Sequence, residues 1–416
     1  MNDDIYVISL VIFFIISKKF IKFVVQKSLA MYKDLAIRHE KIREKLRNEN
    51  IEACLISTNV NLLYATGRIY AGYFYLSAEG EPFTFVRRPH GMAGENIHYI
   101  RKPEDIINIL AEKNLPLPKT LLVEGGEISH AEWLRYEKSF NPATLIDGTT
   151  LLRRVRSVKT DYEVAQIAES CRKHSEDYAH FPSLYRAGMT DHEITVEMER
   201  LLRLSGNLGV FRIFGSSMEA FFGSVLAGDN AGAPSPYDFA LGGAGLHPSL
   251  PLGHNGTLLA KGMSIMVDFA GNYNGYLSDL SRTFSVGKLT GEAYRAHQTA
   301  IDIIHALMKM GKPGARAEDL YLKSLEMTEK AGLADCFMGK EQQAKFVGHG
   351  VGLVINELPV LCMKSKDILQ ENMVIAIEPK FIIDGVGAVG LEDTFVVRKE
   401  GLERLTTAEE KIIMMN

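Results

Sequence analysis

The sequence predicts an α/β domain followed by an α+β domain that contains an internal repeat. Residues 31–156 alternate between helical and strand-like segments, as the chains of α/β domains do. Residues 157–416 contain two successive units of helix, helix and hairpin, which indicates a duplication about a pseudo-twofold axis. We therefore expect three parts: an apolar N-terminal segment over 1–30, an N-terminal domain over 31–156 and a C-terminal domain over 157–416.

The first part contains the apolar run IYVISLVIFFII and has three interpretations. The run is short for a membrane-spanning helix, and the acidic stretch Asn2-Asp3-Asp4 before it does not fit a signal peptide. We favour a translation start at Met31, from which the chain reads like the beginning of a domain. Membrane association through residues 1–30 is the second interpretation, and a cleaved signal is the third.

The N-terminal domain is predicted from its alternating pattern, and no catalytic cluster is visible in it. The expected helices span Leu35 to Asn50 and Glu104 to Lys113, and the expected strands span Ala53 to Ser57, Tyr73 to Leu76, Phe83 to Val86 and Thr120 to Glu124. The segment from Asp147 to Lys159, which includes Asp-Gly and the basic run RRVRSVK, is predicted to be the linker to the next domain.

The C-terminal domain is expected to contain two pairs of helices, one in each repeat unit. In the first pair, capping boxes at Thr160 and Thr190 open helices that extend to Ala187 and Ser205. The helices of the second pair span Gly291 to Met310 and Ala317 to Ala331. The stretch 206–256 is rich in Gly and Pro, and long irregular loops in compact domains are usually functional, so it is a candidate substrate-facing segment.

The composition narrows the classes of function. The 416 residues are 46% hydrophobic and 24% charged, with a formal net charge of -4, which provides no basic surface for nucleic acid. We therefore expect a peptide or a small-molecule substrate. The four cysteines form no Cys-x-x-Cys pair, which favours free thiols in a reducing compartment, so the cytoplasm is the expected location.

Four carboxylates and one histidine in the last third of the chain predict a metal site. Asp268 and Asp279 lie in two apolar runs that flank Asn274-Gly275, a strong hairpin signal, so they should meet across paired strands. Glu378 and Glu392 flank a second turn in the same way. Carboxylates buried in strands need a positive partner, and a pair of metal ions is the economical one.

His349, in the motif HGVGL, adds a single imidazole to the four carboxylates. An oxygen-rich donor set without a thiolate suits Mn²⁺ or Co²⁺ best, with Fe²⁺ and Zn²⁺ as alternatives. We expect two divalent ions held by five residues: Asp268, Asp279, His349, Glu378 and Glu392.

These motifs resemble the pita-bread metallopeptidases, the family of methionine aminopeptidase, aminopeptidase P and prolidase. The resemblance implies a pita-bread C-terminal domain, a creatinase-type N-terminal domain and a homodimer. It implies that Asp279 and Glu392 bridge two ions and that a metal-bridging hydroxide is the nucleophile. The activity it implies is that of an Xaa-Pro aminopeptidase or Xaa-Pro dipeptidase, with Glu378 accepting and returning a proton.

Two positions depart from the family pattern. The motif HGxGLxxHE reads HGVGLVINE here, so Asn356 stands in place of a substrate-contacting histidine. A second family histidine falls at or near Pro251, where His247 and His254 are the neighbouring candidates. His254, His247 and Asn356 are therefore the candidates for contacting the substrate and the tetrahedral oxyanion.

Because of these departures, two alternatives to proline-specific cleavage stay open. One is a creatinase-like or related hydrolase or lyase that acts on a small metabolite. The other is a non-catalytic binding protein derived from a peptidase, which the complete set of five metal-ligating residues disfavours.

Overall fold

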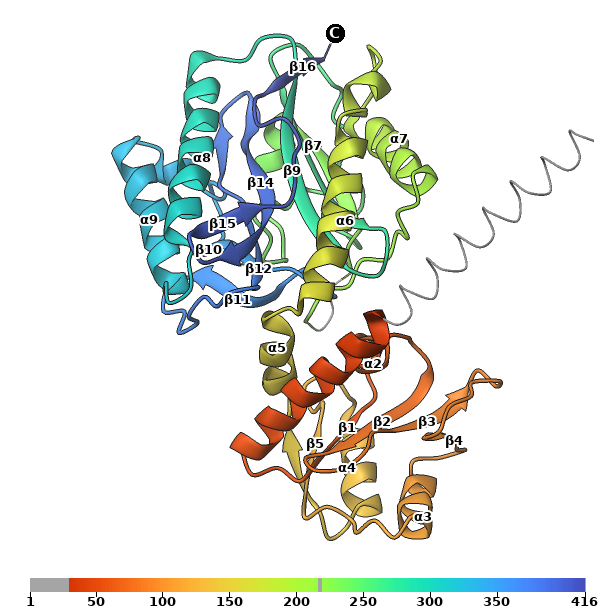
Figure 1. The fold of residues 1–416 in the computed structure, drawn as a ribbon. Helices are drawn as coiled ribbons and strands as arrows, with labels where there is room; N and C mark the ends of the chain where they lie inside the picture. The colour runs from red at the N-terminus through yellow and green to blue at the C-terminus, as the bar shows by residue number, and fades with distance from the viewer. Residues whose placement is uncertain (1–29, 216–218, 416) are drawn as a thin grey trace, which may run out of the picture. The chain divides into compact units, whose positions relative to one another are not determined.

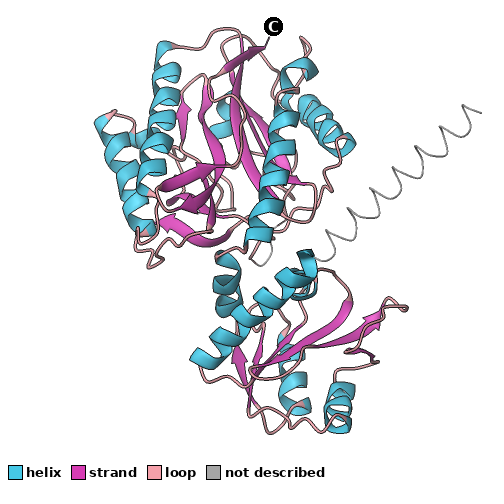
Figure 2. Cartoon of the chain, in the orientation of Figure 1, coloured by secondary structure: helices cyan, strands magenta, loops and turns pink. Residues whose placement is uncertain are grey.

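The computed structural model describes residues 30–215 and 219–415, and the chain divides into two compact units between Val155 and Arg156 (Figures 1 and 2). The predicted segment 1–30 lies outside the described residues except for its last one, so its three interpretations stay predictions. Within the described ranges, no helix has the length and apolar character needed to cross a membrane. All four cysteines are free, and Cys54 and Cys171 are buried.

The first unit contains a mixed six-stranded sheet with the order β4-β3-β2-β1-β5-β6. It opens with a helix over residues 30–48. The other elements are β1 (Ala53–Ile56), α2 (Asn59–Thr66), β2 (Ala71–Ser77), β3 (Phe83–Arg88), β4 (Ile97–Tyr99), α3 (Glu104–Glu112), β5 (Thr120–Val123), α4 (His130–Ser139) and β6 (Thr144–Asp147). The strands and helices expected from the sequence are present, and α2, α4, β4 and β6 are additional.

Glu124 connects two segments of this unit that are distant in the sequence. Its fully buried carboxylate accepts hydrogen bonds from the backbone N–H groups of Ser57 and Thr58, at 2.6 and 2.9 Å, and from Asn61 Nδ2 at 2.6 Å. Thr58 is the N-cap of α2 and makes no side-chain capping bond of its own. Glu124 therefore supplies the acceptor that the start of this helix lacks.

The second unit contains a ten-stranded sheet with the central order β11-β10-β12-β14-β9-β8-β7. Its strands are β7 (Gly223–Ala227), β8 (Ser264–Asn272), β9 (Leu277–Val286), β10 (Phe346–Gly350), β11 (Glu357–Cys362), β12 (Val374–Ile377), β13 (Lys380–Ile383), β14 (Gly387–Arg398), β15 (Gly401–Arg404) and β16 (Ile413–Met415). Its helices are α6 (Asp161–Tyr178), α7 (Asp191–Leu204), α8 (Gly291–Met310) and α9 (Ala317–Lys330), with 3₁₀ turns η1 (Phe181–Leu184), η2 (Gly228–Gly232) and η3 (Ala334–Cys336).

The internal repeat is visible in this unit. In Figure 1 the pair α8–α9 lies at the left of the sheet and the pair α6–α7 at its right. Each pair precedes one long hairpin in the chain. Helix α6 packs against β8 and β9 of the first hairpin, and α8 packs against β13 and β14 of the second. Strands β9 and β14 pair with each other, so the two repeats within the second unit meet at the middle of its sheet.

The starts of helices α6 and α7 follow the capping signals of the sequence. Thr160 and Glu163 form a complete capping box at the start of α6, and Thr190 and Glu193 form one at the start of α7, as predicted. The segment that was predicted to be a linker is largely helical, because residues Thr149–Ser157 form helix α5. Asp147 accepts hydrogen bonds from the N–H and hydroxyl groups of Thr149, which starts the helix where a loop was expected.

Alternation along the strands separates an apolar face of the second sheet from a polar face. Val267, Phe269 and Leu280 pack with the helices α6 and α7 in one core cluster. Ile377 and Leu391 pack with α8 and α9 in another. In each strand, the residues that alternate with these apolar residues therefore point to the opposite face of the sheet, away from the helices.

Buried histidines make the stability of the second unit depend on pH. Burial lowers the pKa of His174 to about 3, with a smaller contribution from Arg282, and burial lowers that of His297 to about 4. In the unfolded chain each would have a pKa near 6.5. The unfolded state therefore binds more protons as the pH falls below about 6.5, and the folded state loses stability over that range.

We expect His174 to contribute a decrease in the free energy of unfolding between about pH 7 and about pH 5. Denaturant unfolding at both values should show a smaller decrease for His174→Gln than for the wild type. The exposed His180 lies just after α6, and His180→Gln is the matched control that should keep the wild-type pH dependence. Equal pH dependence in the wild type and His174→Gln would contradict this account.

Candidate metal centre

The predicted metal-ligating residues lie on five neighbouring segments of the polar face. In the strand register, Asp268 of β8 and Glu392 of β14 both pair with Ser281 of β9, one from each side. Pairing of Ile377 with Asp393 and of Lys380 with Gly390 places Glu378 opposite Glu392. Three carboxylates thus lie in one row across the sheet.

Asp279 and His349 approach this row from two further positions. Asp279 lies on β9 two residues before Ser281, so its side chain is on the same face. His349 lies on β10, and its Nε2 is 3.4 Å from Glu378 Oε1 and 3.7 Å from Asp279 Oδ2. Asp279, Glu378 and Glu392 are buried, whereas the side chains of Asp268 and His349 are 30% and 12% exposed.

The five residues form two overlapping groups that have the dimensions of a metal site. One group is Asp279, His349 and Glu392, and the other is Asp268, Glu378 and Glu392. Within each group one ligand atom per residue lies within 4.8 Å of the others. Glu392 belongs to both groups, and the structure therefore brings together all five residues that the sequence selected.

Lys380 is a sixth residue of this centre, and the sequence analysis did not select it. Its Nζ lies 2.8 Å from Asp268 Oδ2, 2.7 Å from Glu378 Oε2 and 3.3 Å from Glu392 Oε2. The lysine is completely buried. A signal was present in the sequence, because a lysine two residues after Glu378 in an apolar strand points to the same face as that glutamate.

The protonation states reflect the crowding of these groups. Burial raises the pKa of Asp279 to about 7 and that of Glu392 well above its ordinary value, and the neighbouring carboxylates add to both shifts. Burial also opposes ionisation of Glu378, but Lys380 and His349 hold its pKa at about 2. Additional positive charge beside Asp279 and Glu392 would favour their ionised forms.

The first group of donors fits a divalent ion. Glu392 Oε1 is buried and has no hydrogen-bond partner among the residues that the structure describes. His349 Nδ1 lies 3.1 Å from the carbonyl oxygen of Gly350, and when Nδ1–H donates to that oxygen the lone pair of Nε2 faces the carboxylates and can bind a metal ion. The second group is different, because Lys380 Nζ already contacts all three of its carboxylates.

Arg282, on the opposite face of the sheet, and the hydroxyl group of Thr394 fix the backbone beneath the centre. Arg282 donates to the carbonyl oxygen of Glu392 at 2.7 Å and forms a buried ion pair with Asp393. Thr394 Oγ1 accepts from the N–H of Asp279 and donates to its carbonyl oxygen. These bonds hold β9 and β14 together at the positions of two predicted ligands.

The two candidate histidines have different environments. His254 is buried, and its ring lies 4.8 Å from the ring of His192 and 5.5 Å from that of Phe221, measured between centroids. Burial, followed by the His192 charge, lowers the pKa of His254 to about 4, so the imidazole is neutral at neutral pH. His247 is exposed, and its Nδ1 is paired with Ser249 in its own turn.

His254 also lies near the edge of the ligand row. A Cβ on the adjacent Gly253 would lie 3.4 Å from Ser224 Cβ, and Ser224 of β7 pairs with Asp268. His254 is therefore the histidine that the fold places in the neighbourhood of the carboxylates. His192 and Phe221 were not selected from the sequence, because they come from separate segments that only the fold brings together.

Asn356 has its amide group engaged with the backbone. Its Nδ2 donates to the carbonyl oxygen of Phe214 at 2.9 Å, and its Oδ1 accepts from the N–H of Phe214 at 2.7 Å. The neighbouring N–H of Ile355 donates to the carbonyl oxygen of Arg212. Asn356 thus fastens the irregular segment that ends at Phe214 to the end of the HGVGLVINE motif.

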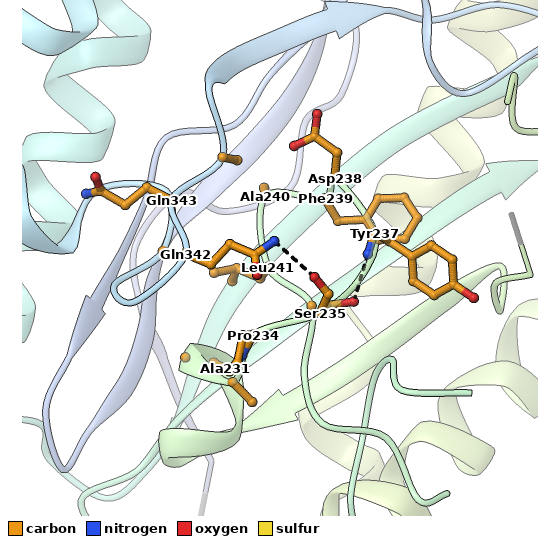
Figure 3. Close-up of a pocket in the computed structure, with 15 residues that line it drawn as sticks. Ala231, Pro234, Ser235, Tyr237, Asp238, Phe239, Ala240, Leu241, Gln342 and Gln343 are labelled. Atoms are coloured by element: carbon orange, nitrogen blue, oxygen red, sulfur yellow. Dashed lines mark hydrogen bonds between the residues drawn. The ribbon is translucent and has the colours of Figure 1, made fainter. Parts of the chain in front are cut away.

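A small pocket in the second unit lies apart from the predicted ligands. It is lined by η2, the loop over residues 233–242 and the loop over residues 339–344 (Figure 3). Gln342 Nε2 donates to the carbonyl oxygen of Ser235 at 3.0 Å across this space. No residue of the metal centre lines the pocket, so we do not assign the chemistry to it.

Comparison with known proteins relates both units to one group of enzymes. The model of metallopeptidase family M24 matches residues 165–399, and that of the creatinase/prolidase N-terminal domain matches residues 38–158. An Xaa-Pro dipeptidase of Pyrococcus furiosus is 24% identical over 383 residues, which cover 90% of this chain and 99% of the relative.

Solved structures share the architecture of the whole chain at low identity. The X-Pro aminopeptidase of Thermotoga maritima matches with a TM-score of 0.73 at 21% identity, over 90% of this chain and 99% of that chain. The Xaa-Pro dipeptidase of Bacillus anthracis matches with a TM-score of 0.74 at 20% identity, over 92% and 100%. The protein belongs to metallopeptidase family M24, and the expected pita-bread and creatinase-type domains are confirmed.

We expect Mn²⁺ to stabilise the folded protein, because the ion binds the native donor set and not the unfolded chain. At 100 times the dissociation constant the gain is about 2.7 kcal/mol, or roughly 5–10 °C in melting temperature for a domain of this size. Calorimetry with and without Mn²⁺ measures it. Glu392→Gln should lose most of the shift, whereas the exposed Glu326→Gln should keep it. An equal shift in both variants would contradict the assignment.

Proposed function

We propose that this member of metallopeptidase family M24 hydrolyses the peptide bond before proline, as an Xaa-Pro dipeptidase or Xaa-Pro aminopeptidase. The observation that carries the proposal is the convergence of Asp268, Asp279, His349, Glu378 and Glu392 on one face of the sheet. The preference for proline is supported by the relatives named above, whose similarity extends over nearly the whole chain.

The centre requires at least one divalent ion, for which Asp279, His349 and Glu392 are the proposed ligands. When bound, such an ion supplies a water molecule of lowered pKa and polarises the carbonyl group of the scissile bond. Mn²⁺ or Co²⁺ is our first choice and Fe²⁺ or Zn²⁺ the alternative, because the donors are oxygen-rich. The sequence predicts two ions.

Glu378 is the proposed proton acceptor. Its Oε2 is engaged by Lys380, while Oε1 faces the side of His349. The low pKa keeps the carboxylate ionised at neutral pH, which a group that accepts a proton from water requires. After accepting the proton, Glu378 would deliver it to the leaving nitrogen.

His254 and the segment fastened by Asn356 are proposed to shape the substrate site. A buried, neutral imidazole donates one hydrogen bond and accepts another, so His254 suits a carbonyl group or an oxyanion. Asn356 acts through the segment that ends at Phe214, and Phe221 lies against His254. His247 is the weaker candidate because it is exposed and bonded within its own turn.

The two alternative functions predict different substrates or no turnover at all. A creatinase-like hydrolase or lyase would act on a small guanidino or N-acyl compound, and a non-catalytic binding protein would bind peptides without turnover. Both would retain the fold.

The expected homodimer also remains a proposal, which light scattering during size-exclusion chromatography would test.

We expect chelation to abolish hydrolysis of Xaa-Pro dipeptides and added Mn²⁺ or Co²⁺ to restore it. A panel of Ala-Pro, Leu-Pro and Met-Pro, their tripeptides extended at the C-terminus, and Ala-Ala should show turnover only where proline follows the first residue. Product formation is followed by chromatography. Turnover of creatine or N-acyl compounds without any Xaa-Pro cleavage would favour the metabolite hydrolase instead.

We expect Asn356→Ala to raise KM by up to roughly thirty-fold, because two hydrogen bonds of about 1 kcal/mol each hold the Phe214 segment in place. Steady-state kinetics measure KM and kcat separately, and bound metal should be unchanged. The exposed carboxamide Gln298 provides a control, since Gln298→Ala removes only a surface bond to Asp302. A loss confined to kcat would instead assign Asn356 a direct role in the reaction.

A further inference from the structure

The ammonium group of Lys380 contacts three carboxylates of the metal centre, as a bound cation would. Its ammonium group has three N–H donors, and three carboxylate oxygens lie within 2.7–3.3 Å of Nζ, one each from Asp268, Glu378 and Glu392. A buried charge is tolerated when it is paired and hydrogen-bonded, and here every donor has an acceptor. The lysine is therefore a fixed part of the centre.

The backbone around Lys380 is adapted to its position. Lys380 begins β13 and pairs with Gly390 of β14. A Cβ on Gly390 would lie 2.8 Å from Lys380 Cα and 2.3 Å from the carbonyl oxygen of Pro379, and its φ of +141° also favours glycine. Thr283 Oγ1 accepts from the N–H of Gly390 and donates to its carbonyl oxygen. The strand pair thus approaches closely at the point where the lysine enters the centre.

The three partners of Lys380 are the same residues that form one of the two metal-sized groups. Asp268, Glu378 and Glu392 could surround a second ion only while one oxygen of each is also engaged by the ammonium group. A dication there would lie within a few ångströms of another full positive charge in a buried site, where the repulsion is weakly screened. The other group, Asp279, His349 and Glu392, does not contact Lys380 through Asp279 or His349 in the described structure.

We infer that the centre holds one divalent ion, and that the ammonium group of Lys380 takes the place of the second. Asp279, His349 and Glu392 would hold the ion, on the side of the centre where Glu378 Oε1 lies near His349. Glu392, which belongs to both groups, would then contact both the ion and the lysine. The inference deepens the proposed function and rests on it for the identity of the site as a metal centre.

Metal stoichiometry tests the inference in the wild-type protein. The intact chain is dialysed against Mn²⁺, and bound metal is measured by mass spectrometry together with electron paramagnetic resonance. We expect one Mn²⁺ per chain and the spectrum of an isolated ion. Two ions per chain with a spin-coupled spectrum would overturn the inference, as would the absence of any bound ion.

Substitution of the lysine tests its role directly. Lys380→Ala removes the ammonium group and opens space, so a second Mn²⁺ and a spin-coupled spectrum are expected, whereas Lys380→Arg keeps the charge and should bind one. Lys340 forms an exposed ion pair with Asp384 near the tip of the same hairpin, and Lys340→Ala is the matched control that should bind one ion. One ion in a folded Lys380→Ala would overturn the inference.

The two proposals fail in different ways. One bound Mn²⁺ without cleavage of any Xaa-Pro peptide would reject the proposed function and leave the inference standing. Two bound ions with metal-dependent Xaa-Pro cleavage would reject the inference and leave the function. If Lys380→Ala does not fold, the stoichiometry and spectrum of the wild type still decide.

Discussion

The gathering of four carboxylates, three of them buried, on one face of a sheet is the constraint on which the second unit depends. Each would be unstable in an apolar environment without a positive partner. The sheet brings them together through strand register, since Asp268 and Glu392 flank Ser281 and Glu378 lies opposite Glu392. The helices pack on the other face, so the fold can be stable there while the polar face carries charges that need a cation.

Much of this centre was predictable from the sequence because its four carboxylates lie in hairpins, and hairpins are local. Asn274-Gly275 identifies the turn between β8 and β9, and the alternation of each strand then decides which side chains share a face. The capping boxes before α6 and α7 were predictable for the same reason. The union of two hairpins through the β9–β14 pairing needed the internal repeat as an additional argument.

The contacts that could not be predicted are those between distant segments. The amide of Asn356 meets the backbone of Phe214, which lies 142 residues earlier, and no local pattern indicates such a partner. The ring of His254 lies against His192 and Phe221 for the same kind of reason. Helix α5 is a different case, because Asp147 beside Gly148 suggested a turn but also supplies the acceptor that starts a helix at Thr149.

Lys380 shows where the pseudo-twofold symmetry of the fold and the chemistry of the site diverge. The residue two positions after Asp268 in the first hairpin is Ala270, which is small and buried, whereas the residue two positions after Glu378 in the second is a lysine. A repeat of carboxylates alone would offer two similar places for cations. Because the second hairpin contributes a cation of its own to the polar face, the two places become different, and on our inference the metal ion binds at the place beside Asp279 and His349.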